Sequence, residues 1–391
     1  MASAALKPQA VQVWLRLGAL ALLSLAIAGC VPRSRGPRPL PPQPAEEVEA
    51  APESRLPPGE TMNRVAVLVP LTGSNGALGR SILNAANLAL LDTGGNRIRI
   101  TAYDTANGAA PAANEALAEG SGLILGPLLA EDVRAVAPLA RRARVPVIAF
   151  SNDSGVAGDG VYLMGITPAQ SIARVVGHAR SRGAAGFGAL VPASVYGERA
   201  SAAMVAAVEG AGGRLTGMQT YTPGAIQAAA ARLNGMGRTD AVLVADGPRA
   251  ALQAVPTIRQ SSPQPRLLAT ELWASEANIG ASVGLRGAWY AAPSDGLYGQ
   301  FRSRYRARYN VNPYRLATLG YDAVLLAVRV AADWPVGRPF PERALRNSDG
   351  FTGVDGAFRF GRDGLADRAL EVREVTATGT NVVSPAPRGF N

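Results

Sequence analysis

A polar loop follows a buried strand in the first half of the chain. Residues 145–150 form a continuous apolar run, and the polar residues 151–154 (Ser-Asn-Asp-Ser) follow it directly. An earlier apolar run, residues 122–125, is joined to it by a segment with helical spacing, which predicts a strand-helix-strand unit. Parallel strands joined by a helix end at the same edge of a sheet, where open α/β sheets bind ligands. The hydroxyl, amide and carboxylate groups of the loop therefore either contact a ligand or cap the loop itself.

The sequence carries no motif typical of an enzyme. It has no P-loop, no G-x-G-x-x-G and no G-x-S-x-G turn with a plausible histidine partner. The single histidine, His178, falls on a helical pattern, which favours a structural role, and one histidine cannot form the usual zinc cluster. No pattern sets two carboxylates as an acid–base pair. We therefore expect a protein that is not an enzyme and that holds neither a cofactor nor a metal.

The N-terminus has the pattern of a bacterial export signal. Lys7 and Arg16 precede an apolar stretch, residues 17–28, that is too short to span a bilayer comfortably. Small residues then lead to Cys30, the only cysteine, in an arrangement similar to a lipobox. This predicts a lipoprotein signal peptide over residues 1–29 and lipidation of Cys30 by acyl chains such as palmitate. The alternative is an ordinary signal peptide that happens to be followed by a cysteine.

Residues 30–61 are the predicted lipidated cysteine and a Pro-rich linker. Prolines and glutamates dominate this segment, which indicates a polyproline or disordered arm. If fully extended at roughly 3.1 Å per residue, the arm would reach on the order of 90 Å. Val31, and not an aspartate, follows the cysteine, a feature similar to lipoproteins of the outer membrane. We therefore expect the chain to be anchored at the periplasmic face of the outer membrane of a Gram-negative bacterium.

The formal net charge of +10 does not indicate nucleic-acid binding. Lys7 is the only lysine, and the other 38 basic residues are arginines scattered along the chain. A nucleic-acid binder would gather its positive charge on one face. The densest basic run, residues 301–309, has an aromatic residue at every fourth position and arginines between them, which is typical of a helix with one solvated face. We therefore expect no nucleic-acid partner.

Two series of alternating strand and helix patterns, each of about 100 residues, follow the linker. They predict an α/β fold of two Rossmann-like lobes with parallel sheets, joined by three hinge crossings. We expect residues 62–165 and 294–334 to form the first lobe, and residues 166–293 and 335–391 to form the second. Within the last segment, residues 351–375 read as a hairpin with glycines at its turn.

Six short motifs follow one another in the order found in type I periplasmic binding proteins. They are VAVLVPLTG at residues 65–73, GPL at 126–128, VPVIAFS at 145–151, YGER at 196–199, YDA at 321–323 and FTGVDG at 351–356. The chain resembles that superfamily over roughly residues 63–380. The lipobox and the loop with Leu272-Trp273 resemble, more specifically, the penicillin-binding-protein activator lipoproteins. The Leu/Ile/Val-binding proteins of ABC importers are closely related in fold.

This resemblance implies a ligand cleft between the lobes. Amino-acid binders of this type hold a zwitterion with a hydroxyl-bearing loop, a carboxylate and several tyrosines. Carried over to this chain, the candidate cleft residues are Ser151, Asn152, Asp153, Ser154, Tyr196, Asp246, Glu271 and Tyr321. For each of them, loop capping or lobe-to-lobe hydrogen bonding is the alternative role.

Three positions depart from the amino-acid binders. Leu78 stands where an aromatic residue is expected, and Asp246-Gly247 replaces another. Leu128-Leu129 replaces the Ser/Thr-rich loop that would hold a ligand carboxylate. A cleft poor in carboxylate-binding groups favours an outer-membrane lipoprotein that binds and activates a peptidoglycan synthase of the penicillin-binding-protein class, with a role in cell-wall biosynthesis. The alternative is an ABC-transporter solute-binding lipoprotein for an amino acid or a related small polar ligand in the interlobe cleft. A purely structural lipoprotein is a third hypothesis.

Overall fold

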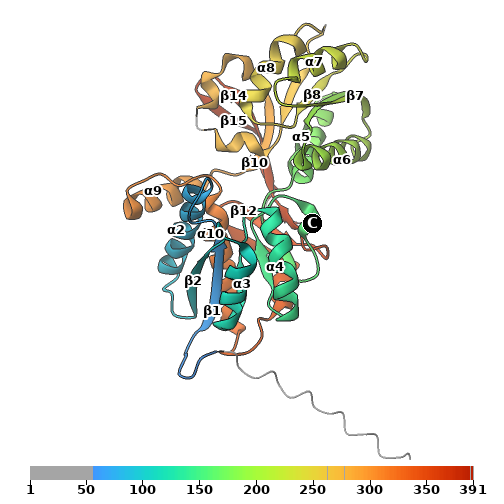
Figure 1. Ribbon diagram of the computed structural model, residues 1–391. Helices are drawn as coiled ribbons and strands as arrows, with labels where there is room; N and C mark the ends of the chain where they lie inside the picture. The colour runs from blue at the N-terminus through green and yellow to red at the C-terminus, as the bar shows by residue number, and fades with distance from the viewer. Residues whose placement is uncertain (1–55, 262, 277, 388, 391) are drawn as a thin grey trace, which may run out of the picture. The chain divides into compact units, whose positions relative to one another are not determined.

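The computed structural model describes residues 56–390 except 262, 277 and 388. The predicted signal peptide, the lipidation of Cys30 and most of the linker lie outside the described residues. The described residues form two α/β lobes (Figure 1). No helix among them is long and apolar enough to cross a membrane.

The first lobe is a parallel five-stranded sheet between two helical layers. Its strands are β1 (Asn63–Val69), β2 (Ile98–Asp104), β3 (Ser121–Leu125), β4 (Val147–Ala149) and β5 (Val161–Leu163), and its helices are α2 (Gly76–Asp92), α3 (Ala109–Ala118), α4 (Ala130–Arg142), α9 (Tyr298–Tyr309) and α10 (Ala317–Val330), with 3-10 helices η1 (Ser154–Val156), η5 (Ala331–Asp333) and η6 (Glu342–Arg346). The strand order is β2-β1-β3-β4-β5. Helices α2, α9 and α10 pack on one face of the sheet and α3 and α4 on the other (Figure 1). Because both faces are covered, the apolar strand β1 is buried along almost its whole length.

The second lobe repeats this three-layer plan with a longer sheet. Its strands are β6 (Gly186–Pro192), β7 (Arg214–Tyr221), β8 (Ala241–Val244), β9 (Arg266–Ala269), β10 (Trp289–Pro293), β14 (Leu370–Thr376) and β15 (Gly379–Ser384), and its helices are α5 (Pro168–Ser181), α6 (Val195–Gly210), α7 (Ile226–Asn234) and α8 (Pro248–Ile258), with η2 (Glu271–Ser275), η3 (Ile279–Ala281) and η4 (Val283–Leu285). The strand order is β15-β14-β10-β9-β8-β6-β7, in which β14 pairs antiparallel with both β10 and β15 and the other neighbours pair parallel. Helices α5 and α6 cover one face, and α7 and α8 cover the other.

The chain passes between the lobes three times. Residues 164–167 join β5 to α5, residues 294–297 join β10 to α9, and residue 369 joins β13 (Ala366–Arg368) to β14. The predicted fold of two α/β lobes with three crossings is therefore confirmed.

The last crossing lies later in the chain than the sequence suggested. Residues 335–369 were expected in the second lobe, yet Phe351, Phe358 and Phe360 belong to the hydrophobic core of the first. They lie on a small antiparallel sheet of β11 (Phe351–Gly353), β12 (Gly356–Phe360) and β13, whose β11–β12 hairpin matches the predicted turn. Asp322 of α10 fixes that turn, because its carboxylate accepts hydrogen bonds from the backbone amides of Val354 and Asp355 at 2.7 and 3.2 Å. Aromatic packing and this carboxylate therefore hold the segment on the first lobe.

Candidate functional site

A cavity of about 270 Å³, here called the inner chamber, lies between the carboxyl ends of the two parallel sheets. The first lobe contributes the loops after β1, β3 and β4, and the second contributes the loop after β9. Most of the wall is apolar and consists of Leu78, Leu128, Leu129, Phe150, Ile166, Leu272, Pro293, Leu316 and Leu319. Polar groups enter only through Asn75, Asn152, Glu271, Ser275 and Arg315. Such a wall suits a small ligand with an apolar body and few polar groups.

Glu271 is the buried carboxylate of the inner chamber. It begins η2 directly after β9, and only 8% of the residue is exposed. Tyr196 donates a hydrogen bond of 2.9 Å to Oε1, and Ser171 donates one to Oε2. Burial raises the pKa of the Glu271 carboxyl, and the hydrogen bonds that it accepts oppose this rise. Within the described part of the chain Glu271 forms no ion pair, so hydrogen bonds from two hydroxyl groups and from its own backbone amide stabilise its charge.

Tyr196 is placed by the start of α6. Ser194 caps this helix, since its hydroxyl accepts a hydrogen bond of 3.2 Å from the amide of Gly197. Tyr196 therefore lies in the first helical turn, with its hydroxyl 2.9 Å from both Thr270 Oγ1 and Glu271 Oε1. Burial, followed by the charge of Glu271, raises the pKa of Tyr196 well above its ordinary value. The hydroxyl is thus a donor that orients the Glu271 carboxylate.

The loop after β4 has a more structural role than a ligand-binding role. The Ser151 hydroxyl accepts a hydrogen bond from the amide of Asp153, and Asp153 Oδ1 accepts one from the amide of Gly155. Ser154 opens η1, and only Asn152 lines the inner chamber. Loop capping therefore describes Ser151 and Asp153 better than contact with a ligand.

Asp153 also links the two lobes. Its carboxylate pairs with Arg134 of α4 at 2.5 Å and with Arg199 of α6 at 3.0 Å. The pKa of Asp153 lies below its ordinary value, because hydrogen bonds from the amide of Gly155 and from the two arginines outweigh burial. Lobe-to-lobe bonding, the alternative that the sequence left open for the cleft residues, is what the structure shows here.

Two other candidate residues do not line the inner chamber. Asp246 accepts a hydrogen bond of 2.7 Å from the hydroxyl of Tyr221 and one of 2.6 Å from the amide of Gly247, the residue before α8. Tyr321 faces α2 and α9, and its hydroxyl donates a hydrogen bond of 2.7 Å to Asp92 at the end of α2. This bond and burial raise the pKa of Tyr321 to about 12. The structure therefore brings Tyr196 and Glu271 together and places Glu271 and Asn152, from opposite lobes, on the lining of the inner chamber, whereas Tyr196, Asp246 and Tyr321 do not line it.

Arg315 is a chamber residue that sequence reasoning missed. It precedes α10, and its Nη1 donates to Asp355 Oδ1 at 2.6 Å. Its guanidinium carbon lies 4.4 Å from the centre of the Tyr298 ring, and its Nη2 lies 3.9 Å from Asp295 Oδ1. Nothing in the sequence distinguishes it from the other arginines.

Two α/β lobes joined by three chain passages, with a ligand-sized chamber between them, define a two-lobed binding protein. A model of the periplasmic binding protein family matches residues 63–380, and the chain belongs to this family. The family is one of binding proteins, and membership indicates a periplasmic location. A comparison with curated protein sequences finds no match.

Solved structures of the same fold include binding proteins of ABC transporters. A substrate-binding protein from Sphaerobacter thermophilus has a TM-score of 0.70 at 19% identity, covering 83% of this chain and 98% of that one. A leucine-binding protein from Thermotoga maritima has a TM-score of 0.62 at 20% identity, covering 83% and 99%. A solute-binding protein from R. palustris, solved in complex with benzoate, has a TM-score of 0.63 at 17% identity, covering 84% and 97%. Identities of this size show a shared fold alone.

Proposed function

We propose that this chain is a solute-binding protein that closes its lobes on one small organic molecule in the inner chamber. The observation that carries the proposal is Glu271, a buried carboxylate in a mostly apolar chamber, which has no cationic partner among the described residues. The solved substrate-binding proteins that share this fold support the same function. The prediction of a synthase activator has no such support.

The geometry favours a ligand with a cationic or donor group and an apolar body. A buried carboxylate is costly unless a charge or several donors compensate it. A ligand ammonium at Glu271 would supply that charge and lower the pKa of the carboxyl again. The leucines at 78, 128, 129 and 316 would then contact the apolar part of the ligand. Amino acids and related amines with branched or aromatic groups fit this description.

A thermal-shift screen tests the proposal. A ligand that binds the folded state at one hundred times its dissociation constant stabilises it by about 2.7 kcal/mol, which raises the melting temperature by several degrees. Glu271→Gln should abolish the shift caused by an amine ligand, whereas Glu209→Gln, at an exposed position near the end of α6 that does not line the chamber, should keep it. If no amino acid or amine shifts the wild type, or if both variants respond alike, the proposal is wrong.

Lipid anchoring remains a prediction of the sequence and belongs to the same proposal. Cys30 would carry the acyl chains, and Val31 would direct the protein to the outer membrane. Metabolic labelling with palmitate tests this, because label should enter the wild type and not the Cys30→Ser variant. Label in neither protein would rule out lipidation.

Activation of a peptidoglycan synthase is the second hypothesis, and its support is the lipobox and the Leu272-Trp273 loop. A pull-down with membrane-embedded penicillin-binding proteins separates it from solute binding. Retention of a synthase, together with a faster synthase reaction, would favour the activator. Failure on both counts would rule out the activator.

A further inference from the structure

A second cavity opens beside the inner chamber. Its volume is about 790 Å³, and we call it the outer chamber. Leu78, Ala274, Ser275, Arg315 and Leu316 line both cavities. The two chambers are therefore adjacent, and a ligand longer than a single amino acid would reach from one toward the other.

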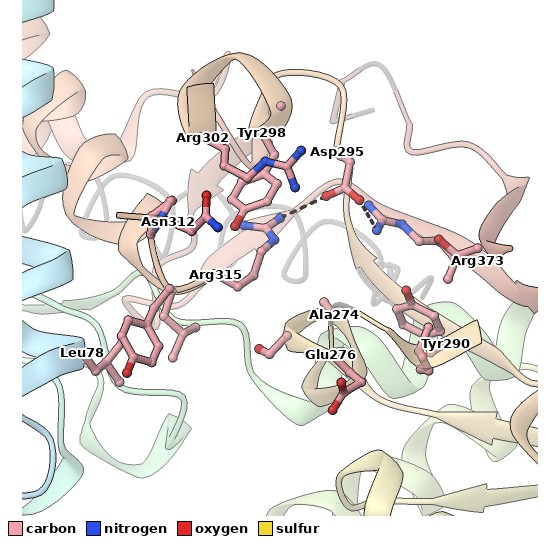
Figure 2. Close-up of a pocket in the computed structure, with 18 residues that line it drawn as sticks. Leu78, Ala274, Glu276, Tyr290, Asp295, Tyr298, Arg302, Asn312, Arg315 and Arg373 are labelled. Carbon is pink, nitrogen blue, oxygen red and sulfur yellow. Dashed lines mark hydrogen bonds and ion pairs between the residues drawn. The ribbon is translucent and has the colours of Figure 1, made fainter. Parts of the chain in front are cut away.

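Hydrogen-bond donors without an acceptor gather on one side of the outer chamber. Arg302 is exposed and makes no hydrogen bond or ion pair with another described residue. Arg315 Nη2 is buried without a hydrogen-bond acceptor and lies 3.9 Å from Asp295 Oδ1. Figure 2 shows Arg302, Tyr298 and Arg315 side by side on this wall. Because the tyrosine hydroxyl is also without a hydrogen-bond partner in the described part of the chain, the wall offers several free donors.

The acceptors of the outer chamber are mostly engaged. Asp295, in the second crossing, accepts a hydrogen bond from Arg373 of β14 (Figure 2). Arg373 in turn is bound by Glu371 at 2.7 Å, so its charge is compensated. Glu276 is the lining carboxylate to which no described residue donates. Donors therefore exceed free acceptors, and the wall around Arg302 suits an anionic group such as a carboxylate.

Two groups of opposite sign lie in separate chambers, and Arg315, which lines both, is already paired with Asp355. Glu271 faces the inner chamber only, and Arg302 faces the outer chamber only. In an α-amino acid the ammonium and the carboxylate share one carbon atom, so the two groups cannot enter separate chambers. An extended peptide places them further apart by roughly 3.5 Å for each added residue.

We infer that the ligand is a short peptide with apolar side chains, whose N-terminal ammonium binds Glu271 and whose C-terminal carboxylate binds Arg302. This inference rests on the proposed function, since it takes Glu271 as the group that holds the ligand ammonium. The leucines of the inner chamber contact the first side chain of the peptide, and Leu78 and Leu316, shared by both chambers, contact the second.

Isothermal titration calorimetry of the full chain with leucine, the dipeptide Leu-Leu and Leu-Leu amide tests the inference. Leu-Leu should bind about tenfold more tightly than leucine or the amide, since a charge-assisted hydrogen bond to a carboxylate is worth roughly that factor. Arg302→Gln should weaken Leu-Leu about tenfold and leave the amide unchanged. Arg306→Gln, an exposed arginine one turn further along α9 that does not line the chamber, should change neither.

The outcomes separate this inference from the proposed function. Equal affinities for Leu-Leu and its amide, or an Arg302→Gln variant that binds Leu-Leu as well as the wild type, would overturn the peptide inference. A loss of affinity in Arg306→Gln equal to that in Arg302→Gln would also overturn it, because general surface charge would then explain the effect. Binding of leucine or an amine that depends on Glu271 would leave the proposed function intact in each of these cases. No binding by any probe would overturn both.

Discussion

Asp153 pairs with one arginine from each lobe, so replacing either arginine tests what holds the lobes together. Arg134 belongs to the same lobe as Asp153, whereas Arg199 belongs to the other lobe. The arginine side chains are 54% and 43% exposed, and the Asp153 side chain is only 7% exposed. The two ion pairs are thus similar in setting, and only the pair with Arg199 crosses between the lobes.

The expected magnitudes follow from this exposure. An ion pair whose arginine is about half exposed is worth roughly 0.5–1 kcal/mol. Arg134→Gln and Arg199→Gln should therefore lower the free energy of unfolding by similar, small amounts in urea denaturation. Only Arg199→Gln should also change the ratio of closed to open lobes, by about two- to fivefold toward the open state. A ligand that binds only the closed state should lose affinity by at most the same factor.

Pulsed electron paramagnetic resonance can measure this shift. Spin labels at Asn114 of α3 and Gln227 of α7, both exposed, report the distance between the lobes in a Cys30→Ser background. The distance distribution of Arg199→Gln should gain a longer component that the Arg134→Gln variant lacks. If the two variants give the same distribution, or if neither differs from the parent, the Asp153–Arg199 pair does not hold the lobes closed.

Three further predictions concern stability. Gly197→Ala should lower the free energy of unfolding by about 2–4 kcal/mol, because the new Cβ would lie 1.8 Å from the carbonyl oxygen of Pro192. Gly177→Ala, at a helical position with open space around it, should instead raise this free energy by about 0.5–1 kcal/mol. If urea denaturation shows a change of the same sign for the two variants, the packing argument is wrong. Burial, followed by the charges of nearby arginines, lowers the pKa of His178 below its ordinary value of 6.5. The unfolded chain therefore binds a proton at this histidine more readily than the folded chain does. As the pH falls below about 6.5, the wild type should lose more stability than His178→Gln, and parallel urea midpoints from pH 8 to 5 would contradict this. Tyr196→Phe removes one of the donors to Glu271 and should cost about 1 kcal/mol, with an unchanged urea midpoint as the contrary result.

The two lobes could be predicted from the sequence because their strands and helices have strong hydrophobic patterns. Continuous apolar strands such as residues 65–69, alternating with helical segments, have one compact arrangement, a parallel sheet covered on both faces. The segment around Phe351, Phe358 and Phe360 has no such pattern that would assign it to one lobe. Short antiparallel strands with aromatic residues can cover either core, and the choice depends on partners such as Asp322 that are distant in the sequence. This is why the boundary at residue 335 was misplaced.

The candidate site was predictable only where backbone geometry alone directs a side chain. Glu271 follows a strand and Tyr196 opens a helix, so both lie at the edge where the sheets end. Tyr321 lies within a helix, where a change of one position rotates a side chain by about 100°. Its neighbour Asp322 points to the turn between β11 and β12, and Tyr321 points to α9 instead. Asp246 also follows a strand, but a nearby tyrosine hydroxyl and its own helix start satisfy its oxygens.

The two lobes have the same turn at the start of α2 and of α6, but an apolar side chain follows it in one lobe and a polar one in the other. A Cβ on Gly79 would lie 1.8 Å from the carbonyl oxygen of Pro70, and a Cβ on Gly197 would lie at the same distance from that of Pro192. Leu78 and Tyr196, the residues before these glycines, therefore hold equivalent positions at the start of α2 and α6. The first lobe presents leucine there, and the second presents the hydroxyl that orients a carboxylate.

This difference suggests an order of events in closure. A ligand ammonium can bind to the second lobe alone, because Glu271 and both of its hydroxyl donors belong to that lobe. The apolar part of the ligand becomes buried only when the first lobe brings its leucines against it. Burial of about 100 Å² of apolar surface is worth roughly 2.5 kcal/mol, which exceeds the roughly 0.5–1 kcal/mol of the Asp153–Arg199 pair. Contact with the ligand, more than the Asp153–Arg199 pair, therefore decides whether the lobes stay closed.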